Sequence, residues 1–185
     1  MMMDRTKFFP RARSTVFRGY MTQPQVDGLN ALLDAWDASG LTDSRYLAYM
    51  LATAYHETAA TMQPIPEIGK GRGRPYGAVQ PNGHVYYGRG YVQLTWPNNY
   101  KVLGEALGVD LYDDPDLALK PDIAAKIMFY GMEHGTFTGK KLADYFNVHI
   151  TDFLNARRIL NGMDRAAQIA VYAREFFAAI GESSK

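Results

Sequence analysis

Nine glycine or proline residues interrupt the stretch between Gln63 and Tyr91, and this punctuation constrains the fold more than any other feature of the sequence. They are Pro64, Pro66, Gly69, Gly71, Gly73, Pro75, Gly77, Pro81 and Gly83. Such a density excludes a helix, because neither residue type sustains a helix interior. Aromatic and β-branched residues flank Pro81-Asn82-Gly83, which predicts a small β-hairpin over residues 76–87.

Helical periodicity is present on both sides of this stretch. Thr22 to Gln25 forms a capping-box pattern that predicts a helix ending at Ser39-Gly40, and a second helix is predicted from Thr42-Asp43 to about Ala60. Further helices are predicted at 97–108, 121–131, 138–146, 151–162 and 164–181. The sequence therefore predicts a mainly α fold with one small β element.

The length of 185 residues is enough for one compact domain, which we expect to comprise an N-terminal arm (1–20) and a core (21–181). The arm is basic and is expected to be a solvated tail, with contact to an anionic envelope as the alternative. We expect neither a signal peptide nor a membrane span, because the N-terminus lacks an apolar h-region and no window reaches ~18 uncharged apolar residues.

Several chemistries are excluded by the residues themselves. The chain has no cysteine, which removes thiolate zinc sites, cysteine nucleophiles and disulfides. His56-Glu57 lacks the second histidine of a zincin, because that position is Ala60, and the other histidines show no metal-ligand spacing. Nucleophile-elbow and phosphate-binding motifs are also absent. We expect no metal and no cofactor.

Carboxylate chemistry remains, and two glutamates differ in their surroundings. Glu57 lies at the border of the apolar stripe of its predicted helix, where partial burial favours the protonated form and suits a general acid. Glu67 lies in an irregular loop that also contains Lys70, Arg72 and Arg74, so positive charge favours its ionised form and suits a general base.

The segment from Tyr86 to Trp96 combines aromatic rings, amides and a hydroxyl, which are the groups that a sugar-binding cleft requires. Period-two alternation of a strand would place Gln93, Thr95 and Tyr91 on one face. A strand buried in the core explains the apolar positions of this segment but not its alternating polar ones.

Three ordered motifs resemble those of family 19 glycoside hydrolases. They are His56-Glu57-Thr58, the Tyr86–Trp96 segment with Asn98-Asn99-Tyr100 after it, and Ile159-Leu160-Asn161-Gly162. The absence of cysteine and the stretches 137–142 and 155–158 resemble the phage and prophage endolysins of that family more than the plant chitinases.

The resemblance implies a lysozyme-like α+β fold with two helical lobes, a cleft for β-1,4-linked N-acetylated sugars, and hydrolysis with inversion. It matches Glu57 to the general acid and Glu67 to the general base. Residues of the motifs expected to bind substrate are His56, Tyr87, Arg89, Tyr91, Gln93, Thr95, Asn99 and Asn161. One position departs from the chitinase pattern: Gln168 stands where chitinases have an arginine on the last helix, which leaves Arg165 as a substitute.

The leading hypothesis is a peptidoglycan hydrolase of the muramidase type, acting as a monomer on glycan strands. It would be held in the host cytoplasm until a holin-like, membrane-permeabilising partner releases it. A chitinase is the nearest alternative, since it would use the same acid, base and cleft. A non-catalytic glycan-binding module is disfavoured because both glutamates are present. Residues 70–76 alternate cations with glycine and suggest nucleic-acid binding, but the net charge of only +1 disfavours that reading.

Overall fold

The computed structural model describes residues 3–183. Its helices and strands in chain order are α1 (Arg5–Ser14), α2 (Gln23–Ser39), α3 (Ser44–Glu57), β1 (Ile65–Pro66), β2 (Arg89–Gly90), α4 (Pro97–Leu107), α5 (Pro121–His134) and α6 (Ala166–Ser183). Short 3-10 turns lie at Pro75–Gly77, Pro115–Leu119, Leu142–Asp144 and Asn155–Ile159. The predicted mainly α fold with a small β element is confirmed.

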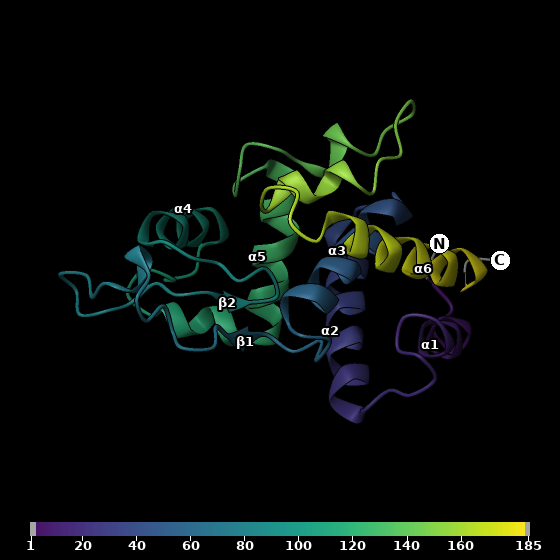
Figure 1. The fold of residues 1–185 in the computed structure, drawn as a ribbon, viewed down its shortest axis with the longest axis horizontal. Coiled ribbons are helices and arrows are strands. Elements are labelled where there is room, and N and C mark those ends of the chain that lie inside the picture. Colours follow the sequence, from purple (N-terminus) through teal and green to yellow (C-terminus); the bar gives the residue numbers. More distant parts are fainter. Residues whose placement is uncertain (1–2, 184–185) are drawn as a thin grey trace.

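Two lobes flank α5 (Figure 1). One is helical and contains α1, α2, α3 and α6, with α3 packed along α6. The other contains β1, β2, α4 and long irregular loops. The segment between α5 and α6 lies beside the two lobes and carries two of the 3-10 turns.

Helix boundaries follow local capping. The predicted capping box at Thr22 is present, with its hydroxyl accepting from the Gln25 N–H and the Gln25 side chain accepting from the Thr22 N–H. Asp43 caps α3, which is buried from Leu47 to Ala54 and ends at Glu57, three residues before the predicted end. The end of α3 therefore falls at the predicted catalytic acid.

Three predictions of local structure are wrong. Residues 76–87 contain no strand; the two-stranded sheet instead pairs Ile65 with Gly90 and Pro66 with Arg89. The predicted turn exists, since Gly83 N–H donates to the Gln80 carbonyl, but the residues around it do not form a ladder. The predicted helices at 138–146 and 151–162 are reduced to 3-10 turns at Leu142–Asp144 and Asn155–Ile159.

The N-terminal arm is not a solvated tail over its described residues. Its α1 packs against α6, and Phe8, Ala12, Val16 and Phe17 are buried in the core. These apolar residues outweigh the basic ones that suggested a tail. Within residues 3–183, none of the helices is both long and apolar enough to cross a bilayer.

Candidate functional site

A polar cavity of about 410 Å³ lies against the loop-rich lobe and contains four of the predicted substrate-binding residues: Gln93, Thr95, Asn99 and Asn161. The rest of its lining is mostly apolar or aromatic: Tyr76, Val92, Leu94, Trp96, Phe137 and Leu160. Hydrogen-bonding groups among apolar surfaces suit a ligand with polar edges and apolar faces, as a pyranose has.

Hydrogen bonds to the backbone hold the polar side chains of this cavity in place. The Gln93 amide nitrogen donates to the carbonyls of Ile65 (3.0 Å) and Gly90 (3.1 Å). The Asn99 amide nitrogen donates to the Thr95 carbonyl (2.9 Å), and the Thr95 hydroxyl donates to the Gln93 carbonyl (3.0 Å). The donors of Gln93 and Thr95 are therefore used internally, whereas one bond uses only one of the two N–H groups of Asn99. All three side chains have an oxygen that can accept from a ligand.

Two residues of the cavity have a strained backbone. Gln93 and Trp96 adopt φ values of 52° and 75°, which side chains other than glycine rarely adopt. Such strain is often found at functional sites. Trp96 is 47% exposed, and its ring meets that of Tyr76 edge to face at 5.5 Å. An exposed aromatic wall thus borders the polar groups.

Glu57, at the end of α3 in the helical lobe, is held by a buried arginine from the segment between α5 and α6. Arg157 Nη1 donates to Glu57 Oε1 at 2.6 Å, and the two side chains are only 5% and 18% exposed. Arg157 Nε donates to the Asp164 carbonyl, and the Arg157 carbonyl accepts from the Asn161 N–H. The same short segment therefore anchors the carboxylate and positions a residue of the cavity.

Two buried hydroxyls precede Glu57 along one face of α3. Tyr49 Oη and Thr53 Oγ1 are buried without a hydrogen-bond partner, at intervals of four residues from Glu57. Burial raises the pKa of Tyr49, which also lies in the field of Arg157 and Glu57. Unpartnered buried hydroxyls are uncommon and costly, and these two lie about one and two helical turns before the carboxylate.

Glu67 is held from the loop-rich lobe by uncharged donors. Its Oε1 accepts from the Tyr76 hydroxyl (2.8 Å) and its Oε2 from the Gly88 N–H (3.1 Å). Gly71 and Gly77 let the loop fold back, since a Cβ on Gly77 would lie 1.8 Å from the Gly71 carbonyl oxygen. Tyr76 also lines the cavity, so one hydroxyl links the second carboxylate to it.

Part of the chain is similar in sequence to known chitinases. The family described as "Chitinase class I" matches residues 74–135. An endochitinase of Arabidopsis thaliana is 34% identical over 110 residues, covering 58% of this chain and 38% of its own. Chitinase 11 of rice (Oryza sativa subsp. japonica) is 36% identical over 86 residues, covering 45% and 33%. The chain thus spans little more than a third of these plant relatives.

Solved structures match nearly the whole chain. A bacterial family 19 chitinase aligns with a TM-score of 0.61 and 26% identity, covering 98% of this chain and 96% of its own. Chitinase C of Streptomyces griseus aligns with a TM-score of 0.69 and 23% identity, covering 97% and 77%, which supports the fold. In sequence over residues 74–135 and in fold over nearly its whole length, this chain is similar to the family 19 chitinases.

Not every motif residue that family 19 suggested reaches the cavity. Arg89 is 4% exposed; it donates to Asp116 (2.8 Å) and Tyr100 (3.1 Å), and its guanidinium lies 3.6 Å from the centre of the Tyr87 ring. Tyr91 is fully buried, which raises its pKa to about 12. Arg89, Tyr87 and Tyr91 therefore support the wall of the cavity from within and do not line it.

Tyr91 is buried and does not share a face with Gln93 and Thr95 at the cavity, because the segment is not one extended strand. Only Arg89 and Gly90 are strand residues, and the chain then turns so that Arg89 pairs with Leu94. The left-handed φ of Gln93 lies within that turn.

His56 is half-buried beside Glu57, and burial lowers the pKa of its imidazole against the opposing effect of the carboxylate.

Arg157 is the residue that sequence reasoning missed. Gln168, at the position where family 19 chitinases have an arginine, instead donates to the Tyr172 hydroxyl (2.7 Å). The arginine that contacts Glu57 is Arg157, not Arg165. The Arg157-Arg158 pair close before Asn161 was visible in the sequence, but nothing local distinguishes the buried arginine from its exposed neighbour.

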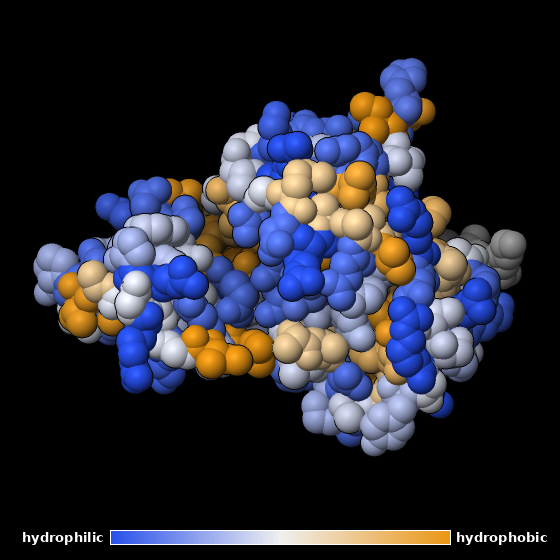
Figure 2. Space-filling model, viewed as in Figure 1, coloured by the Kyte–Doolittle hydropathy of each residue, from blue (hydrophilic) through white to orange (hydrophobic). Residues whose placement is uncertain are grey.

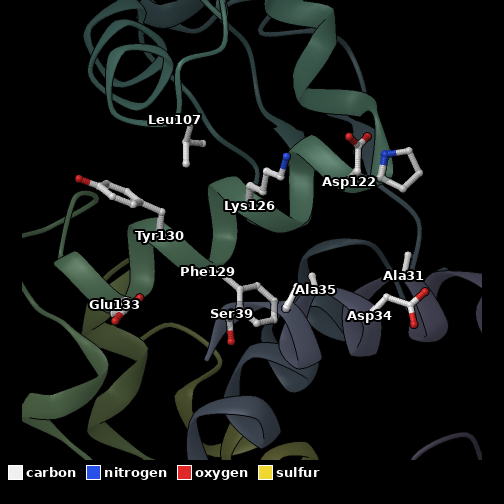
Figure 3. Close-up of a pocket in the computed structure, with 12 residues that line it drawn as sticks. Ala31, Asp34, Ala35, Ser39, Leu107, Asp122, Lys126, Phe129, Tyr130 and Glu133 are labelled. Atoms are coloured by element: carbon white, nitrogen blue, oxygen red, sulfur yellow. The ribbon is translucent and has the colours of Figure 1, made fainter. Parts of the chain in front are cut away.

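A larger cavity, of about 610 Å³, lies between α2 and α5 and is separate from the site (Figure 3). Its surface is mostly apolar, with Ala31, Ala35 and Phe129 among its lining residues. One of its carboxylates, Asp34, is ion-paired with Arg5. None of the motif residues contributes to it, so the smaller polar cavity is the candidate active site.

Proposed function

We propose that this chain hydrolyses β-1,4 glycosidic bonds between N-acetylated sugars, and that its substrate is the glycan strand of peptidoglycan. The observation that carries the proposal is the pair of carboxylates held from two lobes, each linked by one residue to a cavity lined by amides, a hydroxyl and aromatic rings. A glycosidase of the two-carboxylate type requires these groups.

In the proposed reaction, Glu57 in its protonated form donates its proton to the leaving glycosidic oxygen, and the carboxylate that results is paired with Arg157. Glu67 takes a proton from a water molecule that attacks the anomeric carbon from the opposite face, so the configuration inverts. The oxygens of Gln93, Thr95 and Asn99 would accept hydrogen bonds from sugar hydroxyls, acetamido groups or the attacking water. The exposed Trp96 would cover the apolar face of a ring.

Peptidoglycan is favoured over chitin by the stretches 137–142 and 155–158, which resemble endolysins. It is also favoured by the exposure of Asn161 and Trp96 at the cavity, since muramic acid carries a bulky peptide that a closed cleft would exclude. Chitin hydrolysis is the second candidate. It is supported by the relatives and the matching structures, which are named as chitinases.

Mass spectrometry of borohydride-reduced digests of purified peptidoglycan tests the proposal. A muramidase releases fragments ending in reduced muramic acid, and the Glu57→Gln variant should release none. New ends on reduced glucosamine would contradict the muramidase assignment while keeping the glycosidase. Cleavage of chitohexaose without any cleavage of peptidoglycan would establish the chitinase alternative.

A further inference from the structure

A second functional feature is the loop at residues 69–74, directly after Glu67, which we name the basic loop. Three cations alternate with glycines in it, and all three are exposed: Lys70, Arg72 and Arg74. Within residues 3–183, none of the ion pairs includes these cations. The chain has no Asp or Glu between Glu67 and Glu105. The basic loop therefore carries positive charge next to the proposed base.

The other acids of the loop-rich lobe belong to the segment 105–116. Asp116 is paired with the buried Arg89 at 2.8 Å. Three further acids line, together with Lys101, a hollow that shares no residue with the candidate active site: Glu105, Asp110 and Asp113. Most acids of this segment are thus paired or line another hollow, and Glu67 is the acid that the basic loop follows directly.

Three consecutive turns order the backbone of the basic loop. The N–H group of each cation donates to the carbonyl three residues earlier, at 3.1, 3.0 and 2.9 Å along the chain. The alternating glycines have left-handed φ values of 85°, 75° and 75°, a conformation that glycine adopts without strain: Gly69, Gly71 and Gly73. Each cation is therefore placed by its own turn, so binding of a ligand need not order the backbone first.

The basic loop borders the candidate active site on the side of the proposed base. Lys70 Nζ lies 5.9 Å from the centre of the Tyr87 ring, which supports the wall of the cavity. Burial and the bond to Glu67 raise the pKa of Tyr76, and the charge of Arg74 opposes this rise, so Arg74 acts on a group that lines the cavity. Figure 2 shows strongly hydrophilic residues on the outer surface of the loop-rich lobe, at the left, and a hollow between this lobe and the rest of the molecule. A long ligand in the cavity can therefore reach the loop.

We propose that the basic loop binds the carboxylates of the stem peptides of peptidoglycan, and that it thereby selects peptidoglycan over chitin. The inference rests on the proposed function, because it concerns a strand bound in the same cavity. Muramic acid carries stem peptides with free carboxylates, whereas chitin is uncharged. Arginine and lysine donate charge-assisted hydrogen bonds to carboxylates. Nucleic acid is the disfavoured occupant, because one short loop on a chain of net charge +1 provides few phosphate contacts.

Sedimentation with purified, insoluble sacculi from a bacterium without teichoic acids tests this proposal. The parent in this experiment is the Glu57→Gln protein, so that binding is measured without turnover. In that background the loop variant, Lys70→Gln/Arg72→Gln/Arg74→Gln, should bind on the order of ten-fold more weakly at low salt. Exposed ion pairs are individually weak and screened by salt, but this variant loses three of them together.

A matched control removes the same charge from α1, at the opposite end of the molecule from the loop-rich lobe (Figure 1). This α1 variant is Lys7→Gln/Arg11→Gln/Arg13→Gln, and it should bind sacculi like the parent. Sacculi whose carboxylates have been converted to methylamides should bind the parent as weakly as native sacculi bind the loop variant. All six substituted positions are exposed, so both variants should keep the parent's melting temperature.

Equal binding by the parent and the loop variant would overturn the proposal, as would absence of parent binding. An equal loss of binding in the α1 variant, or undiminished binding to amidated sacculi, would also overturn it. Displacement by a single-stranded DNA oligonucleotide at a lower concentration than by a soluble disaccharide peptide would identify nucleic acid as the ligand and overturn stem-peptide binding. The proposed function fails separately: carboxylate-dependent binding without any cleavage by the unsubstituted chain would overturn the hydrolase and leave the role of the loop intact.

Discussion

The two carboxylates of the site are held in different ways by the two lobes. Glu57 ends a buried helix and is paired with a charged group, the guanidinium of Arg157. Glu67 follows a two-residue strand and is held by two uncharged donors, the Tyr76 hydroxyl and the Gly88 N–H. Glu57 is thus the carboxylate of the two that has a charged hydrogen-bond partner.

This difference has energetic consequences. Breaking a buried ion pair leaves a charge without a partner, which costs far more than losing one neutral hydrogen bond. On the helical side of the site, a substitution that breaks the ion pair should therefore lower both the catalytic rate and the free energy of unfolding. On the loop side, loss of catalysis should cost little stability, because Glu67 is held there by two neutral donors and not by an ion pair.

The largest expected effect is on catalysis, from Glu57→Gln. An amide cannot deliver a proton, and losing general acid catalysis lowers the rate on the order of 10²–10⁴-fold. The amide oxygen can still accept from Arg157, so the free energy of unfolding should fall only by about 1–2 kcal/mol. Turnover of permeabilised cell walls and urea denaturation measure the two effects. Glu105→Gln, at an exposed position on α4, is the control and should leave both activity and stability unchanged. Activity of Glu57→Gln above a tenth of the parent's activity would exclude Glu57 as the acid.

Arg157→Ala should test whether the helical side depends on its ion pair. We expect the free energy of unfolding to fall by about 3 kcal/mol, because Glu57 would be left largely buried without its cation. The neighbouring Arg158→Ala is a matched control, since Arg158 is exposed, and should change stability by less than about 0.5 kcal/mol. An equal fall in the free energy of unfolding for both variants would show that the ion pair of Arg157 with Glu57 does not stabilise the fold more than an exposed arginine does.

Tyr76→Phe should test the loop side. Burial raises the pKa of the Tyr76 phenol and its bond to Glu67 adds to that rise, so the hydroxyl remains a neutral donor. Losing it should cost about 1 kcal/mol or less in stability, but should lower kcat about ten-fold by freeing the Glu67 side chain. Tyr20→Phe, at a 73% exposed position, should change neither. A loss of stability without any loss of kcat would mean that Tyr76 is purely structural.

The smallest effect concerns His56 and pH. Burial lowers the pKa of His56 below its usual 6.5, so near that pH the unfolded chain binds a proton that the folded chain does not. Stability should therefore fall as the pH decreases below about 6.5 and should not depend on this group above it. Urea denaturation across this range should show a shallower pH slope in His56→Gln. The exposed His149→Gln should keep the parent slope; an unchanged slope in His56→Gln would contradict the assignment.

The sequence predicted the long helices well because local signals determine them. The capping box at Thr22 and the Asp43 cap fix helix starts through contacts within a few residues. The turn-rich segments were predicted less well. The strand partner of Ile65 lies 25 residues away at Gly90, and nothing in the local pattern of residues 76–87 distinguishes a hairpin from a loop.

The residues of the site were also predicted where a local motif contains them and missed where their role depends on a long-range contact. Gln93, Thr95, Asn99 and Asn161 were predicted from their motifs, and all four line one cavity. Arg157 was missed because its role depends on contact with a residue 100 positions earlier, at Glu57. Long-range pairs of this kind leave no periodicity in the sequence, so only the folded arrangement identifies them.

We propose that carboxylates from two lobes act as an acid and a base on either side of one glycosidic bond. Time-resolved proton NMR of the first products from a β-1,4-linked N-acetylated oligosaccharide tests this arrangement most directly. An inverting pair, with room for a water between carboxyls roughly 6.5–9.5 Å apart, releases the α-anomer first. Initial release of the β-anomer would show retention, and would contradict the assignment of Glu67 as a base acting through water.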